Sequence, residues 1–323
     1  MGTTPRRVVV IGYERTELLD IAGVTDTLDT ANQLGAQPPY EVRLATVGGR
    51  PLPCSSGLTL VGQTALERVR GPLDTLVVSG GPGHEAAARD PDLLDAVRRL
   101  APKSRRVASV CTGATVLAAA GLLDGRRAAT HWGAAADLAA NYPRVKVDPA
   151  PLYIRDGDIW TSAGVTGALD LTLALVEDDH GPDLARTAAR TLVTYLHRPG
   201  NQAQISMFVR APSGENPVVR TVIQHVAGHL NGDLDTSVLA ALAGVSERHL
   251  ARLCQEHLGQ SPARFVRATR AEAAAQLLVS TALPIAAIAR QCGFRTPETL
   301  RQAFLVHYGS TPSEHRARHS HRR

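Results

Sequence analysis

VASVCTGATV, at residues 107–116, is an apolar, β-branched run that stops at Cys111 and turns through Thr112 into a helix-forming stretch. Small residues on either side, Ser109 and Gly113, permit a tight turn there. Such a turn exposes the sulfur, as the nucleophile elbow of hydrolases exposes a serine. The N-terminal end of the following helix stabilises a thiolate and lowers the pKa of the thiol. The segment therefore predicts a strand, a sharp turn and a helix, with Cys111 as a candidate reactive group.

Strand-like and helix-like patterns alternate on both sides of this segment. The strand-like runs are VVVIGY (8–13), YEVRLATVG (40–48), LDTLVVSGG (73–81) and RRVASVC (105–111), and the helical stretches cover 17–32, 92–100 and 112–121. This alternation predicts a parallel sheet covered by helices on both faces. Ligands bind beyond the carboxyl ends of the strands in such sheets. Asp20, Gly80, Gly81 and Cys111 lie near such ends, so we expect these four residues to converge.

The C-terminal part of the chain contains a duplication, with copies at 239–262 and 288–312. Each copy has a short apolar helix, a Gly-containing turn, a Ser or Thr that can cap a helix, and a longer helix. This order of elements predicts two helix-turn-helix motifs, in which the second helix enters the major groove of DNA. A helical interaction bundle is the alternative, and two copies at matched spacing argue against it.

Within each motif the apolar spacing separates a core face from an outward face. Leu250 and Leu253, and then Leu300 and Phe304, are spaced to face the core. The outward residues predicted to bind DNA are Arg248, His249, Arg252, Arg295, Thr296, Glu298, Thr299, Arg301 and Gln302. Between the motifs, 262–279 predicts one continuous helix. Such a helix would hold the two reading helices about one turn of DNA apart, roughly 34 Å.

Charge is distributed unevenly along the chain. Residues 201–323 contain 14 arginines, no lysine and 8 acidic residues, whereas residues 1–200 contain 21 basic and 22 acidic residues. A basic half that uses only arginine suggests an acidic partner, most often nucleic acid. Double-stranded DNA is therefore the expected partner of the C-terminal half.

The composition also predicts the domain organisation. A segment rich in Pro, Gly, Asn, Gln and Ser suits a linker, so we expect an N-terminal domain at 1–197, a linker at 198–216 and a DNA-binding domain at 217–323. The four cysteines share no metal-like spacing, and we expect no metal and no cofactor. No signal peptide or bilayer-length apolar run is evident, so a cytoplasmic, nucleoid-associated protein without a membrane partner is expected.

The C-terminal motifs resemble those of the AraC-type (AraC/XylS) transcription regulators over residues 217–318. The resemblance rests on GVSERHLARL, GQSPARFVRATR, ALPIAAIARQCGF and GSTPSEHR. It implies promoter sites, contact with RNA polymerase and, most often, activation. It also implies DNA contacts by Arg248, Arg252, Glu298, Thr299 and Gln302.

The first half resembles the PfpI/ThiJ branch of the class I glutamine amidotransferase-like superfamily over residues 7–195. VCTGATVLAAAGLLDGRRAATHW is similar to isonitrile hydratases and to sensor domains fused to AraC-type readers. The resemblance implies a flavodoxin-like α/β sandwich ahead of the all-α double helix-turn-helix domain. It further implies a homodimer and a small, nitrogen-containing effector. The implied ligand pocket comprises Asp20, Gly80, Gly81, Cys111, Thr112, His131 and Trp132.

The role of Cys111 stays open at this point. Turnover is not expected, because Thr112 replaces the histidine of peptidase-like members and no His-x-Glu pair follows residue 131. Cys111 is then an inert residue inherited from an enzyme, a residue that contacts the effector, or an oxidant sensor. The alternative is a hydratase or amidase, with Cys111 as nucleophile, Asp20 as acid–base partner, and Gly80 and Gly81 as oxyanion donors. His131 either approaches the sulfur or packs beside Trp132, and Asp20 is otherwise a surface carboxylate.

Overall fold

The computed structural model describes residues 4–194, 216–281 and 283–319. The chain divides into two compact units, Met1–Gln204 and Ile205–Arg323. The predicted linker falls almost wholly outside the described residues, so the domain boundaries stay predictions. No helix in the described part of the chain is both long and apolar enough to cross a bilayer.

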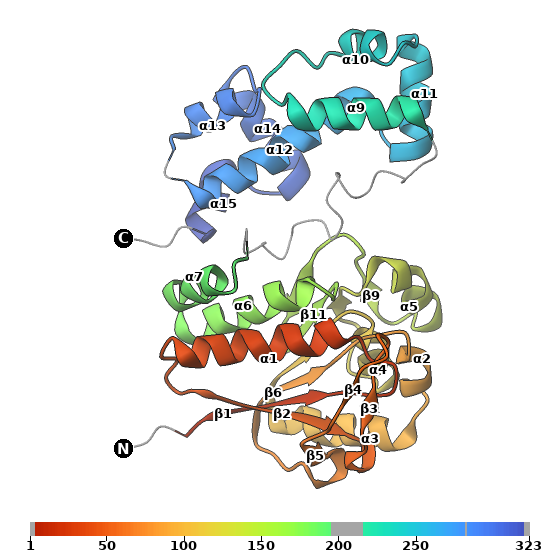
Figure 1. Cartoon of the computed structure of the whole chain (residues 1–323), viewed down its shortest axis with the longest axis vertical. Helices are drawn as coiled ribbons and strands as arrows, with labels where there is room; N and C mark the ends of the chain where they lie inside the picture. The colour runs from red at the N-terminus through yellow and green to blue at the C-terminus, as the bar shows by residue number, and fades with distance from the viewer. Residues whose placement is uncertain (1–3, 195–215, 282, 320–323) are drawn as a thin grey trace. The chain divides into compact units, whose positions relative to one another are not determined.

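A seven-stranded sheet in the order β10-β11-β7-β6-β1-β2-β5 forms the centre of the N-terminal unit. Figure 1 shows this sheet between helices. Only β10 runs antiparallel to its neighbour. The strands are β1 (Arg6–Ile11), β2 (Tyr40–Thr46), β5 (Thr64–Ala65), β6 (Leu73–Val78), β7 (Ser104–Ser109), β10 (Tyr153–Asp156) and β11 (Ile159–Ser162). Two small sheets pair β3 (Leu52–Pro53) with β4 (Thr59–Leu60), and β8 (Arg127–Ala128) with β9 (Lys146–Val147).

Helices cover both faces of this sheet, as the alternating pattern predicted. One face packs on α1 (Leu18–Gln33), α6 (Gly167–His180) and α7 (Pro182–Thr191). The other packs on α2 (His84–Ala87), α3 (Pro91–Leu100), α4 (Gly113–Ala119) and α5 (Ala135–Asn141). Alternate residues of β1 serve the two cores, because successive side chains of a strand point to opposite faces: Val8 and Val10 to one, Val9 and Ile11 to the other. The flavodoxin-like α/β fold is confirmed.

In the C-terminal unit every described element is a helix. These helices are α9 (Pro217–Gly228), α10 (Thr236–Leu242), α11 (Glu247–Leu258), α12 (Pro262–Ser280), α13 (Ile285–Gln291), α14 (Pro297–Tyr308) and α15 (Pro312–His319). The continuous helix predicted between the two motifs is α12. Gly259 and Gly309 end α11 and α14 in the left-handed conformation that glycine adopts at little cost. The all-α fold of this unit is therefore also confirmed.

Candidate functional site

Cys111 lies on a strained turn between β7 and α4. Its φ is +54°, in the left-handed region that non-glycine residues rarely adopt. Two glycines pack directly against it. A Cβ added at Gly80 would lie 2.5 Å from the Cβ of Cys111, and one added at Gly164 would lie 1.9 Å from the same atom. The predicted elbow is therefore present, and it is closed by backbone from two other strand ends.

Asp20, in the first turn of α1, is completely buried beside this elbow. Its Oδ2 accepts a hydrogen bond from the N–H of Gly80 at 3.0 Å, and its Oδ1 accepts one from the N–H of Val165 at 2.7 Å. The surface alternative for Asp20 is therefore wrong. The predicted convergence of Asp20 and Gly80 with Cys111 is confirmed.

Gly81 and Thr112 form a second pair at the same strand ends. The N–H of Gly81 donates to Oγ1 of Thr112 at 2.9 Å, and that hydroxyl donates to the carbonyl of Gly81 at 3.0 Å. The N–H groups of Gly80 and Gly81 are thus both engaged by side chains of the site. The role of Gly80 and Gly81 as oxyanion donors stays a prediction, and in this structure Asp20 and Thr112 accept from these groups.

The electrostatics of the site favour neutral groups. Burial and, to a smaller extent, the Asp20 carboxylate raise the pKa of the Cys111 thiol to about 12. The expected lowering of the thiol pKa by the helix N-terminus is therefore wrong. The cost of burying a thiolate outweighs the stabilisation that the N-terminal end of the short helix α4 provides. Burial also raises the pKa of Asp20 to about 7, against the backbone donors at Val165 and Gly80, which favour the carboxylate.

His131 contacts its own sequence neighbours. Its ring centroid lies 5.5 Å from that of Trp132, and its Nδ1 accepts from the N–H of Gly133 at 3.2 Å. Among the described residues no hydrogen bond links His131 to Cys111 or Asp20. Trp132 is 57% exposed. The packing interpretation of His131 is confirmed, and a base role beside the sulfur is not supported.

The sequence prediction missed three residues near the elbow. Gly164 and Val165 follow β11 and supply the close backbone contact and one of the Asp20 hydrogen bonds. The signal available was IWTSAG, a short apolar run that ends at a glycine. His84, whose Nδ1 lies 3.1 Å from Oγ1 of Thr115 in α4, had no distinguishing sequence signal.

The raised pKa of Asp20 predicts a pH dependence of stability. The folded-state pKa of about 7 exceeds the ordinary value of 3.8 for an aspartate. Asp20 therefore contributes stability that is fully present below about pH 4 and lost as the pH rises through 7. Urea unfolding of the N-terminal unit, followed at several pH values between 4 and 8, measures this loss. We expect the Asp20→Asn variant to lack this part of the dependence. An unchanged pH profile in that variant would contradict the assignment.

The first predicted reading helix, α11, begins as the sequence indicates. Oγ of Ser246 accepts from the N–H of His249 at 3.3 Å, which caps the helix. Leu250 and Leu253 are buried in the core. Arg248, His249 and Arg252 are all exposed, so the predicted outward face of α11 is available for contact.

The second predicted reading helix, α14, has a capping box formed by Thr296 and Thr299. Leu300 and Phe304 are buried. Three exposed side chains are connected on its outward face: Glu298 accepts from Nε of Arg301 and from Nε2 of Gln302, both at 2.8 Å. These bonds, Arg301 first, lower the pKa of Glu298 to about 2. Arg295 is also exposed, just before the helix.

Comparisons with known proteins agree with this arrangement. The family model described as the DJ-1/PfpI family matches residues 6–178, and the one described as a helix-turn-helix domain matches 239–318. The HTH-type transcriptional regulator GlxA of Rhizobium meliloti is 33% identical over 93% of this chain and 92% of its own. The chain belongs to the HTH-type transcriptional regulators of the DJ-1/PfpI family. A second such regulator, CdhR of Pseudomonas aeruginosa, is 31% identical over 93% of this chain and 88% of its own.

Two further proteins resemble only part of this HTH-type regulator. The isonitrile hydratase of Pseudomonas putida is 36% identical over 54% of this chain and 72% of its own. The crystal structure of an AraC family transcriptional regulator from Pseudomonas putida is 28% identical, with a TM-score of 0.50 over 58% of this chain and 100% of that chain. The N-terminal fold thus occurs both in regulators and in an enzyme.

Proposed function

We propose that this protein regulates transcription by reading DNA with α11 and α14, under the control of a small molecule bound at the Cys111–Asp20 site. The observation that carries the proposal is the pair of capped helices, each of which buries an apolar face and exposes a polar one. The exposed side chains are Arg248 and Arg252 on α11, and Glu298, Arg301 and Gln302 on α14. Arginine and glutamine are the side chains that most often read guanine and adenine edges in the major groove.

The effector site favours binding over covalent chemistry. A thiol with a pKa of about 12 is neutral at physiological pH, and the thiolate is the nucleophilic form. A carboxyl group with a pKa of about 7 can either donate or accept a hydrogen bond. The site therefore suits a small polar metabolite, for which a nitrogen-containing compound is our proposal on the basis of the family resemblance.

Coupling between the two domains would occur by a population shift. An effector that binds one arrangement of the basic domains better than another favours that arrangement, and DNA affinity changes accordingly. We further propose a cytoplasmic, nucleoid-associated homodimer that contacts RNA polymerase at promoters, most often as an activator. The predicted joint for this coupling is the linker at 198–216.

Selection of DNA fragments from a genomic pool by the full chain tests the proposal. We expect enriched fragments to share two half-sites about one helical turn apart, and we expect a nitrogenous metabolite to change their affinity. Enrichment without any shared sequence would contradict the reading function. Specific enrichment that no metabolite of a broad panel alters would contradict the sensing function alone.

A hydratase activity is the second candidate, favoured by the isonitrile hydratase similarity and by the contact between Asp20 and the Cys111 thiol. The Cys111→Ala variant separates the two functions. We expect its effector-free DNA affinity to stay within about threefold of the original, a change of about 0.7 kcal/mol or less, while the response to effector changes. Loss of measurable isonitrile hydration in this variant, from a finite rate in the original protein, would establish the enzyme instead.

Cys54→Ala is the matched control for this variant. Cys54 is also buried in the N-terminal unit, and Asp20 is not among the groups that shift its pKa. We expect the effector response to survive in it. A reversible effect of peroxide on DNA affinity, present in the original protein and in Cys54→Ala but absent in Cys111→Ala, would identify an oxidant sensor.

A further inference from the structure

The C-terminal unit contains two separate apolar cores, and α12 contributes to both. Phe265 and Val266 belong to the core of the first motif, together with α9, α10 and α11. Ala271, Ala274 and Leu278 belong to the core of the second, together with α13 and α14. Figure 1 shows α9–α11 towards one end of α12 and α13–α15 towards the other. Each motif is therefore a lobe of its own, and α12 joins the two lobes.

Arg270 lies on α12 at the boundary between these cores, just after the residues of the first and just before those of the second. Its Nε donates to the carbonyl of Leu230 at 2.8 Å, and its Nη2 donates to the carbonyl of Gly232 at 2.7 Å. Both carbonyls belong to the loop between α9 and α10, in the first lobe. Hydrogen bonds from a charged donor are stronger than neutral ones, so these two bonds hold the loop against α12.

The second lobe contacts the same loop and the same guanidinium at Gly293, which lies in the turn between α13 and α14. Gly293 has φ +77°, and a Cβ added there would lie 2.1 Å from the carbonyl oxygen of Leu230 and 2.7 Å from Nε of Arg270. A side chain at this position is therefore excluded by the first-lobe loop and by the guanidinium. The turn that precedes the second reading helix thus packs directly on the first-lobe loop that Arg270 holds.

A second attachment of this kind has a mechanical consequence. A single helix fixes the distance between two lobes along its own axis, but lobes attached only to it can still tilt as the helix bends. A contact away from that axis also fixes their rotation. We propose that Arg270 is a positioning residue that sets the angle between α11 and α14, so that the protein accepts only one spacing of its two half-sites. This inference rests on the proposed reading of DNA by both helices.

Binding of spacer variants tests the inference. The probe is a duplex selected by the full-length protein from a random pool, together with copies in which one base pair is inserted or deleted between the half-sites. One base pair rotates a half-site by about 35°. We expect the original protein to lose affinity at least about tenfold on either change, as for a mismatched site. On the same insertion or deletion, the Arg270→Ala variant should lose less than about threefold in affinity, relative to its own affinity for the parental duplex.

Two companion variants complete the design. Arg267→Ala removes the same charge from an exposed position one turn away on α12, and it should retain the full spacing discrimination. Gly293→Ala disturbs the joint from the second lobe and should relax discrimination even if Arg270→Ala fails to fold. Equal discrimination by Gly293→Ala and the original protein would overturn the inference, as would equal discrimination by a folded Arg270→Ala. Absence of spacing discrimination in the original protein would instead contradict the double reading itself.

Discussion

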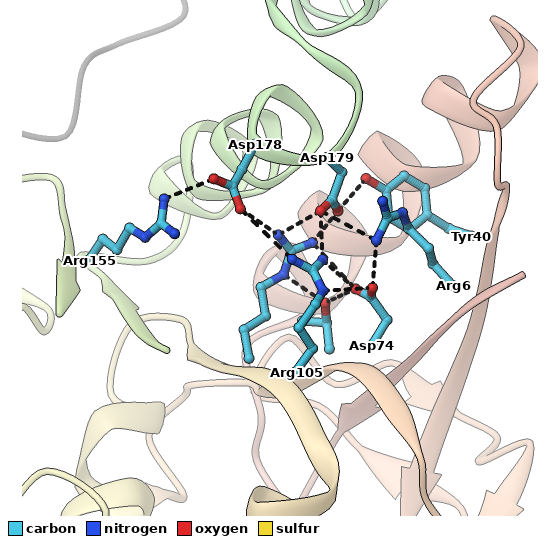
Figure 2. Close-up of polar contacts among 9 residues, drawn as sticks. Arg6, Tyr40, Asp74, Arg105, Arg155, Asp178 and Asp179 are labelled. Carbon is cyan, nitrogen blue, oxygen red and sulfur yellow. Dashed lines mark hydrogen bonds and ion pairs between the residues drawn. The ribbon is translucent and has the colours of Figure 1, made fainter. Parts of the chain in front are cut away.

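Replacing Asp179 with alanine should lower the free energy of unfolding of the N-terminal unit by about 3–5 kcal/mol, the usual cost of removing one partner from a buried ion pair. The Asp179 side chain (Figure 2) is 1% exposed. It pairs with Arg106, which is 3% exposed. It also accepts hydrogen bonds from Arg105 at 2.6 Å and from the hydroxyl of Tyr40 at 2.8 Å. Alanine would leave the buried guanidinium of Arg106 without its main counter-charge.

The position of Asp179 explains why the effect should be confined to stability. It lies near the C-terminal end of α6, and its partners come from the amino-terminal ends of β2 and β7. The Cys111 elbow lies at the opposite, carboxyl edge of the sheet. Specific DNA affinity of the folded variant should therefore be unchanged.

Urea unfolding followed by tryptophan fluorescence measures the loss, since both tryptophans, Trp132 and Trp160, lie in the N-terminal unit. Asp178→Ala is the matched control. Asp178 is 27% exposed, and its short ion pair is with Arg155 at 2.8 Å, whereas it lies 3.6 Å from the buried Arg106. Its removal should therefore cost about 1 kcal/mol or less. A similar cost for the two variants would contradict the burial argument.

The sequence predicted those features that depend on neighbours along the chain. Helix caps at Ser246 and Thr296 involve partners three residues away, so the local pattern contains them. Strand and helix order follows from apolar periodicity in the same way. The convergence of Asp20 with Cys111 followed from one general rule about parallel sheets. These predictions needed no knowledge of long-range contacts.

Features that depend on distant contacts were not predictable. Val165 donates to Asp20 across 145 positions of sequence, and nothing near either residue specifies the partner. Arg106 and Asp179 are 73 positions apart in the sequence, yet their side chains form a buried ion pair. The direction of the shift in the Cys111 pKa was predicted wrongly, because the sequence indicates the helix N-terminus but not the depth at which the thiol is buried.

The double variant Arg252→Ala with Gln302→Ala should weaken specific DNA binding by about 2–6 kcal/mol, roughly 30-fold to 25,000-fold. Each substitution removes a side chain predicted to reach base edges, at about 1–3 kcal/mol each. The two residues lie on different helices, and their hydrogen-bond partners, Glu256 and Glu298, also differ. Their effects should therefore add. Fluorescence anisotropy with the selected duplex, and with a duplex of scrambled sequence, measures the specific part.

Arg220→Ala provides the charge control for this experiment, because Arg220 is exposed on α9, outside both reading helices. Loss of one positive charge alone weakens specific and scrambled duplexes alike and reduces the salt dependence. The double variant should instead lose affinity mainly for the selected duplex. Equal losses on both duplexes would mean that these side chains contact the backbone and that another face of α11 and α14 reads the bases.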